Sequence, residues 1–220
     1  MINKRVLLLC GHYGSGKTNI AVNLAQQIKR EYPTVTLADL DIVNPYFRSK
    51  DSAPELEEAG IRLICSRYAN SNVDIPALPP DLYALTDDRQ MRAIIDVGGD
   101  DRGALVLGRL APAILSENDY EMMMVINCYR PLTRDAASTL EVMREIETSG
   151  GIRFTALINN SNLGAETTAK DVRASVQYAE EVAAMSNLPL VMTTADERLQ
   201  DELKDKIPNL FPLKLQKKIQ

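Results

Sequence analysis

The stretch GHYGSGKT at residues 11–18 constrains this chain more than any other part of its sequence. It follows the apolar run RVLLLC and leads into NIAVNLAQQIKR, which has the apolar spacing of an amphipathic helix. Gly11, Gly14 and Gly16 allow backbone N–H groups to curl around an anion, and the first turn of the helix adds its positive dipole end. The stretch matches G-x-x-x-x-G-K-[ST] at every fixed position, between a strand and a helix as that pattern requires. The sequence therefore predicts a loop that binds the phosphates of a nucleotide.

Two side chains of this loop have predicted roles. Lys17 can reach the β- and γ-phosphates, and the hydroxyl of Thr18 is placed to ligate Mg²⁺. We expect the whole loop and the residue after it to contact the nucleotide. The expected nucleotide-binding residues of this segment are Gly11, His12, Tyr13, Gly14, Ser15, Gly16, Lys17, Thr18 and Asn19.

Short apolar runs alternate with helical patterns along the rest of the chain. Strands that are apolar on both faces are typical of a parallel sheet covered by helices on both sides, and their alternation with helices implies βαβ units. We therefore predict an α/β, three-layer P-loop NTPase fold with a mostly parallel central sheet of about seven strands and helices on both faces. The predicted strands lie at residues 5–10, 35–38, 61–64, 92–97, 121–127, 153–159 and 190–193, and predicted helices at 17–31, 133–148 and 168–185.

The length of 220 residues predicts a single domain over residues 1–220. A polar segment with several prolines, at about residues 66–90, is predicted to be an inserted loop with at most a short helix after Pro80. Such a loop could bind a ligand or partner, or could be a surface excursion without a ligand. The tail at residues 205–220 contains two prolines and is expected to pack onto the domain.

Charge and hydropathy argue against two kinds of partner. The net charge of −5 disfavours a general nucleic-acid-binding surface and attraction to anionic membranes. No apolar run approaches the ~20 residues that a membrane span needs. The segment MINKRVLLLC has no cleavage site of small residues, so we interpret it as a first strand and not as a signal peptide. The cysteines Cys10, Cys65 and Cys128 are odd in number and far apart, which favours reduced thiols and a cytoplasmic location.

Carboxylates at two predicted strand ends could complete a magnesium site. Asp39 ends one predicted strand and Asp41 lies two residues beyond it, whereas Asp96 lies near the end of another strand. Phosphoryl transfer needs acidic groups that hold Mg²⁺ and a group that orients the attacking water. An aspartate after a strand can instead cap a helix. Next to a phosphate loop, Asp96 has the character of a residue that binds the metal through water or through Thr18.

The phosphate loop, ADLDIVNP at residues 38–45 and DVGG at residues 96–99 resemble the MinD/ParA-type P-loop ATPases. This group is also known as CobQ/CobB/MinD/ParA, has a deviant Walker A motif and belongs to the SIMIBI class. The resemblance extends from Arg5 to about Thr194. It implies the fold predicted above, and it implies an ATPase whose two switch loops follow Asp39 and Asp96.

The resemblance also implies roles for single residues. Asp39 would lie near Mg²⁺, Asp41 would orient the hydrolytic water, and Asp96 would be the aspartate of the second motif. The expected catalytic residues are therefore Lys17, Asp41 and Asp96. The expected metal-binding residues are Thr18, Asp39 and Asp96.

At His12 the sequence departs from the pattern of this group. Many members carry a second lysine at that position, which reaches across a nucleotide-sandwich dimer to the phosphates of the partner. His12 is shorter and lacks the fixed charge of a lysine, so it could also be a loop residue that faces solvent. Arg48, Arg102 or Arg130 could supply the charge instead, from either subunit.

The segment ALINNSNLG at residues 156–164 follows a strand at the place where nucleotide-binding folds read the base. GTP-binding proteins use Asn-Lys-x-Asp there, and the aspartate pairs with two donors of guanine. The corresponding residues 159–162 contain no aspartate. By the resemblance Asn159 would contact adenine, so ATP is expected over GTP; an asparagine-rich turn without a ligand is the alternative.

Taken together, these features predict a Mg²⁺-dependent switch that binds and slowly hydrolyses ATP, with hydrolysis stimulated by a partner. The partner is expected to be a second copy in a homodimer or a client protein, by analogy an enzyme whose metal centre or cofactor is being matured. The only histidine is His12, and no other catalytic constellation is evident. Two alternatives stay open: an ATP-dependent ligase or kinase similar to dethiobiotin synthetase or the cobyrinate amidation enzymes, and a nucleotide sensor without turnover.

Overall fold

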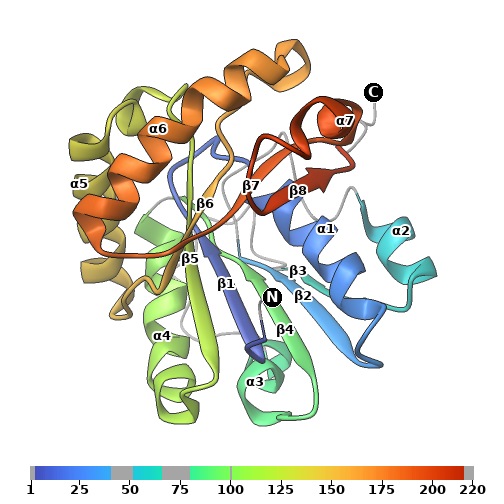
Figure 1. Cartoon of the computed structure of the whole chain (residues 1–220). Coiled ribbons are helices and arrows are strands. Elements are labelled where there is room, and N and C mark those ends of the chain that lie inside the picture. Colours follow the sequence, from blue (N-terminus) through green and yellow to red (C-terminus); the bar gives the residue numbers. More distant parts are fainter. Residues whose placement is uncertain (1–2, 41–51, 66–79, 100, 216–220) are drawn as a thin grey trace.

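The computed structural model describes residues 3–40, 52–65, 80–99 and 101–215. Within this part of the chain, eight strands form one sheet, with helices on both faces (Figure 1). The strands are β1 (Val6–Cys10), β2 (Val35–Asp39), β3 (Arg62–Cys65), β4 (Arg92–Asp96), β5 (Tyr120–Ile126), β6 (Ala156–Asn159), β7 (Leu190–Asp196) and β8 (Leu210–Leu213).

The helices follow the strands in alternation. The α-helices are α1 (Lys17–Lys29), α2 (Ala53–Glu58), α3 (Pro80–Asp87), α4 (Asp101–Glu117), α5 (Ala136–Gly150), α6 (Ala169–Ser186) and α7 (Gln200–Leu203), and short 3₁₀ segments are η2 (Pro131–Thr133), η3 (Gly164–Glu166) and η4 (Glu197–Leu199). The sequence did not predict α2, α4 or α7. The short helix expected after Pro80 is α3, whereas residues 66–79 of the predicted inserted loop lie outside the described residues.

The strand order is β3-β2-β4-β1-β5-β6-β7-β8, and every neighbouring pair is parallel. This confirms the predicted α/β fold with a parallel sheet between two layers of helices. The eighth strand, β8, lies in the tail for which the sequence predicted no element. It pairs with β7 and buries Leu213.

Alternate residues of each strand face opposite layers, as the two-residue period of a strand requires. In β1, the side chains of Val6, Leu8 and Cys10 pack in one core with α3, α4, α5 and α6. Leu7 and Leu9 pack in the other core with α1 and α2. All five are buried, which explains the uninterrupted apolar run before the phosphate loop.

Strands that follow β1 in the sequence are added on both of its sides: β2 to β4 lie on one side and β5 to β8 on the other. β1 lies between β4 and β5, so the connections that leave its two sides diverge at its carboxyl end. Open α/β sheets bind ligands in the crevice at such a point. The fold therefore places the loop after β1 where a ligand is expected.

No helix in the described part of the chain is both long enough and apolar enough to cross a membrane.

Candidate nucleotide-binding site

The predicted phosphate loop connects β1 to α1 at the carboxyl edge of the sheet (Figure 1). Its glycines have positive φ angles, among them 75° at Gly14 and 88° at Gly16. A Cβ on Gly16 would overlap the side-chain nitrogen of Asn160, and one on Gly11 would overlap the carbonyl oxygen of Val125. Glycine is therefore required at residues 11 and 16 by the space available, and at residue 16 also by the backbone conformation.

The carbonyl oxygens of Gly11, His12 and Tyr13 have hydrogen-bond partners within the loop itself. Lys17 Nζ donates to the carbonyl oxygens of Gly11, at 3.1 Å, and His12, at 3.4 Å. The oxygen of His12 also accepts from the N–H of Ser15, at 3.2 Å. The ring nitrogen Nδ1 of His12 lies 3.1 Å from the carbonyl oxygen of Tyr13. His12 thus contacts the backbone of its own loop.

The carbonyl oxygens of Gly14 and Ser15 accept hydrogen bonds from side chains outside the loop. Arg130 Nε donates to the carbonyl oxygen of Gly14 at 2.9 Å, and Asn160 Nδ2 donates to that of Ser15 at 2.6 Å. A loop whose carbonyl oxygens are engaged in this way offers its remaining N–H groups to an anion. The geometry therefore suits a phosphate.

Thr18 and Asp96 meet at the foot of the loop. Thr18 Oγ1 donates to Asp96 Oδ2 at 2.7 Å, and the two residues are 7% and 0% exposed. Asp39, which is also buried, is the register partner of Asp96 on the neighbouring strand. The ends of β2 and β4 thus bring the three predicted metal-binding residues to one edge of the sheet.

This donor set fits Mg²⁺. Magnesium usually keeps several waters and binds through one or two carboxylates together with the phosphates of a substrate. Within the described residues, no cluster of three or more His, Cys, Asp or Glu side chains could hold a metal ion. Thr18, Asp39 and Asp96 therefore suit a magnesium ion that arrives with a nucleotide.

A hollow of about 560 Å³ adjoins the loop, a usual size for a small-molecule site. Its polar end is formed by the loop and the start of α1. Its other end lies at the carboxyl ends of β6, β7 and β8, where apolar side chains could enclose a flat ring. The residues that line it are Gly14, Gly16, Lys17, Thr18, Asn19, Asn160, Asn162, Gly164, Ala165, Thr167, Val172, Thr194, Ala195, Asp196, Leu213 and Leu215.

The structure places Asn159, the asparagine expected to contact the base, outside the lining of the hollow. Asn159 is fully buried and does not line the hollow; its Nδ2 donates to Ser175 Oγ at 2.9 Å, and its Oδ1 accepts from the N–H of Ser161 at 3.1 Å. Asn160 lines the hollow instead, and its Oδ1 accepts from Thr194 Oγ1 at 2.5 Å. Successive side chains at a strand end point to opposite sides. Of two neighbouring residues, one can therefore face the hollow while the other faces the core.

Asn127, which the sequence analysis missed, does not line the hollow but supports the loops beside it. It is fully buried directly after β5, and its Oδ1 accepts from the N–H groups of Tyr129, at 3.0 Å, and Asn162, at 3.3 Å. It thereby ties the loop that carries Arg130 to the loop that carries Asn160. A polar residue that ends the apolar run MMMVIN was the available signal.

The loop after Asp96 packs directly on the phosphate loop. A Cβ on Gly99 would lie 2.7 Å from the backbone nitrogen of Tyr13 and 2.8 Å from the carbonyl oxygen of Gly11. Only a glycine allows this approach without a shift of the backbone. The two glycine-containing segments are therefore in contact.

For some predicted residues the described geometry shows no contact of the side chain with the hollow. Asp41 and Arg48 lie outside the described residues, and the side chain of Arg102 is likewise not among them. Tyr13 is 49% exposed and does not line the hollow. Burial raises the pKa of the Cys10 thiol far above its ordinary value, against the effect of nearby Lys17, so this thiol is a neutral core group.

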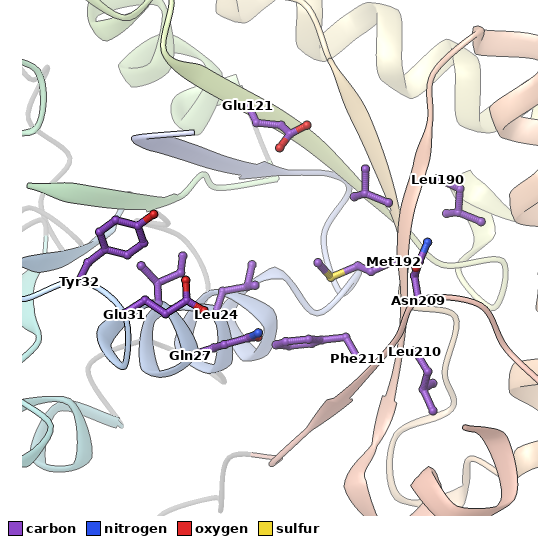
Figure 2. A pocket seen from close by; sticks show the side chains of 12 residues that line it. Leu24, Gln27, Glu31, Tyr32, Glu121, Leu190, Met192, Asn209, Leu210 and Phe211 are labelled. Carbon is purple, nitrogen blue, oxygen red and sulfur yellow. The ribbon is translucent and has the colours of Figure 1, made fainter. Parts of the chain in front are cut away.

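A second hollow, of about 450 Å³, lies near the amino ends of the strands, between α1 and strands β7 and β8 (Figure 2). Its lining combines apolar side chains, such as Leu24 from α1 and Phe211 from β8, with the polar side chains of Gln27, Glu31 and Asn209. Glu121 also lines this hollow, and burial raises its pKa above the ordinary value. This hollow contains none of the predicted site residues.

Comparisons with known proteins support the fold. None of the known protein-family models matches this chain, and no curated protein does. Similar solved structures include the cell division protein FtsY from Thermotoga maritima, with a TM-score of 0.60, 16% identity, and 90% of this chain and 64% of that chain covered. FlhF complexed with GTP/Mg²⁺ has a TM-score of 0.54 and 15% identity, with 88% and 66% covered. The signal recognition particle receptor FtsY from Elizabethkingia anophelis in complex with GDP has a TM-score of 0.51 and 17% identity, with 91% and 60% covered.

At these identities the similarity shows the fold alone, which is that of P-loop nucleoside triphosphatases. The chain spans less than two thirds of the length of each of these three proteins. The resemblance to the MinD/ParA type rests on the sequence motifs and is not tested by these structures.

Proposed function

We propose that this chain binds a nucleoside triphosphate together with Mg²⁺ at the loop between β1 and α1, and that it hydrolyses the nucleotide as a molecular switch. The observation that carries the proposal is the contact of Thr18 with Asp96 at the foot of a loop whose carbonyl groups are turned onto protein donors. The solved structures of FlhF with GTP/Mg²⁺ and of an FtsY with GDP are consistent with this use of the fold.

Each residue of the site has a role in this proposal. Lys17 would bind the β- and γ-phosphates, and Thr18, Asp39 and Asp96 would hold Mg²⁺, which neutralises phosphate charge in the transition state. Asp41 would orient the attacking water. The backbone N–H groups of the loop would bind the phosphate oxygens.

We propose ATP as the preferred nucleotide. Asn160 is the asparagine that contacts the phosphate loop, and Ser161, Asn162 and Leu163 after it include no carboxylate that could pair with the two donors of guanine. The carboxylate of Asp196 lines the hollow, but it accepts from the N–H and Nε of its neighbour Arg198. GTP is the alternative, because the solved structures cited above contain guanine nucleotides.

Titration calorimetry with MgATP and MgGTP tests the proposal. We expect heat of binding for at least one nucleotide, a larger affinity for MgATP, and a loss of binding in Lys17→Ala. Lys206→Ala, which removes an exposed lysine of the same charge, should bind as the wild type does. Absence of heat with both nucleotides would refute the proposed function.

The rate of nucleotide hydrolysis without any added substrate distinguishes a switch from an ATP-dependent ligase or kinase. A switch hydrolyses its nucleotide slowly without any further substrate and responds to a protein partner, whereas a ligase or kinase consumes ATP only when its substrate is present. The contact of Gly99 with the phosphate loop supports the switch, because the loop after Asp96 can respond directly to what the phosphate loop binds. The partner would be a second copy of this chain or a client protein, such as an enzyme under maturation.

A further inference from the structure

Arg130 reaches the phosphate loop from a different part of the chain. It lies between β5 and η2, and its Nε donates to the carbonyl oxygen of Gly14 at 2.9 Å across 116 positions of sequence. A Cβ on Gly14 would lie 3.3 Å from Nε, 3.7 Å from Cδ and 3.8 Å from Cζ of this arginine. The side chain therefore packs against Gly14, and the glycine leaves room for it.

The backbone that carries Arg130 is held firmly. The N–H of Arg130 donates to the carbonyl oxygen of Asn127 at 3.1 Å, and the N–H of Thr133 donates to that of Arg130 at 3.1 Å. The hydroxyl of Thr133 donates to Asn127 O at 2.7 Å, and both Asn127 and Thr133 are buried. A turn fixed at both ends in this way places the arginine with little loss of backbone entropy on binding.

The charge of Arg130 is not neutralised by a protein carboxylate within the described residues. The bond from Nε to Gly14 is the single hydrogen bond of its side chain in that part of the structure, which leaves the four N–H donors of the two terminal nitrogens available. Arg134, in the same loop, differs: it pairs with Asp135, and its side chain is 77% exposed.

We propose that Arg130 is a positioning residue that raises the affinity of the phosphate loop for phosphates. The bond from Arg130 Nε to the carbonyl oxygen of Gly14 keeps this acceptor paired with a protein donor, so that it is not left unpaired beside a bound phosphate. The guanidinium also adds a second positive charge beside the loop; among the described residues, Lys17 is the other cation bonded to it. Arg130 thereby adds its positive charge from the same subunit. The loop itself carries His12 at the position where a second lysine was expected.

This inference rests on the proposed function and adds a residue to it. The test compares Arg130→Gln, Arg130→Lys and the matched control Arg134→Gln with the wild type. Calorimetry gives the Kd of MgATP, or of MgGTP if the wild type prefers it, and thermal unfolding gives the Tm of the nucleotide-free protein.

In Arg130→Gln we expect the Kd to rise roughly tenfold, the order expected for loss of one charge-assisted contact, while the Tm stays close to that of the wild type. Arg130→Lys should recover a large part of the affinity, because it restores the charge. Arg134→Gln should leave the Kd unchanged.

Three results would overturn the inference: an unchanged Kd in Arg130→Gln, an equal loss in Arg130→Lys, or an equal loss in Arg134→Gln. A lowered Tm with equal loss of affinity in both Arg130 variants would show a structural role only, which also contradicts it. If the wild type itself binds neither nucleotide, the proposed function fails; if the wild type binds and Arg130→Gln binds equally well, only the role of Arg130 fails.

Discussion

Thr18 Oγ1 lies 2.7 Å from Asp96 Oδ2, which joins the first turn of α1 to the end of β4 across 78 positions of sequence. Both residues are buried, and Asp39 stands beside Asp96 on the neighbouring strand. This relationship brings a hydroxyl and two carboxylates together at the foot of a loop that suits phosphates. It is the reason for assigning magnesium to this edge of the sheet.

Replacing Asp96 with Asn should weaken the dependence of nucleotide binding on magnesium. The wild type should bind its nucleotide more tightly with Mg²⁺ than with EDTA, because the metal links the phosphates to Asp96. In Asp96→Asn the gain from Mg²⁺ should fall by roughly 10–100-fold, the range found when metal-site residues are replaced. Calorimetry in both buffers measures this gain. Asp87→Asn, which alters an exposed aspartate, is the control, and the same gain in both variants would contradict the assignment.

Replacing Asn160 with Ala should weaken nucleotide binding, whereas Asn159→Ala should not change the preference for a base. Asn160 bonds to the carbonyl of Ser15 and accepts from Thr194 at the hollow, so its loss should raise the Kd by roughly 10-fold or more. Asn159 bonds within the core, so its loss should lower the free energy of unfolding by about 1–3 kcal/mol. Binding curves for ATP and GTP and urea denaturation check both expectations. A change in base preference in Asn159→Ala alone would support the prediction from sequence that Asn159 contacts the base.

Replacing Ser15 with Ala should stabilise the nucleotide-free protein. Within the described residues, the hydroxyl of Ser15 is buried and has no hydrogen-bond partner, which costs free energy in the folded state. We expect the free energy of unfolding to rise by about 1 kcal/mol, as measured by urea denaturation. Ser175→Ala is the matched control, because that buried hydroxyl accepts from Asn159 and donates to a carbonyl group, and its removal should destabilise the fold. A loss of stability in Ser15→Ala would show that the hydroxyl has a partner in solution.

Replacing Glu117 with Gln should destabilise the protein most at neutral pH. Arg5 is 4% exposed and pairs with Glu117, and this hydrogen-bonded guanidinium holds the pKa of Glu117 below its ordinary value of 4.5. A lowered pKa in the folded state means that the ion pair contributes stability above about pH 4.5 and loses it as the pH falls through the lowered pKa. We expect a loss of about 3 kcal/mol at pH 7, since a buried guanidinium loses its carboxylate partner. Denaturation curves between pH 3 and pH 7 should show this difference shrinking in acid.

Glu121→Gln serves as the comparison for this pH series, because its effect on the free energy of unfolding should have the opposite sign. Burial raises the pKa of Glu121, so its ionisation costs stability as the pH rises above the ordinary value of 4.5. The variant should therefore equal or exceed the wild type in stability at pH 7. A pH-independent loss in Glu117→Gln, or the same sign in both variants, would contradict this account.

The sequence analysis predicted elements with an uninterrupted local pattern and missed elements whose pattern is interrupted by glycine or proline. Seven strands were predicted because most of them are short apolar runs, and β1 is buried on both faces, whereas β3 is only partly buried. The helix α4 was missed because Gly103, Gly108 and Pro112 interrupt its pattern, although the structure continues it to Glu117. The strand β8 contains Pro212 and was missed for a similar reason: it lies at an edge of the sheet, where a proline is tolerated.

The sequence by itself determined the phosphate loop and the parallel sheet, because spaced glycines and apolar runs act through contacts between near neighbours in the chain. Tertiary structure alone decided which distant side chains meet at that loop. The pairs Thr18–Asp96, Arg130–Gly14 and Asn160–Ser15 join positions 78, 116 and 145 residues apart. Such pairs depend on the order of strands in the sheet and on which side of a strand end each residue falls. A one-dimensional pattern of strands and helices is compatible with many strand orders, whereas packing of both sheet faces in three dimensions selects one.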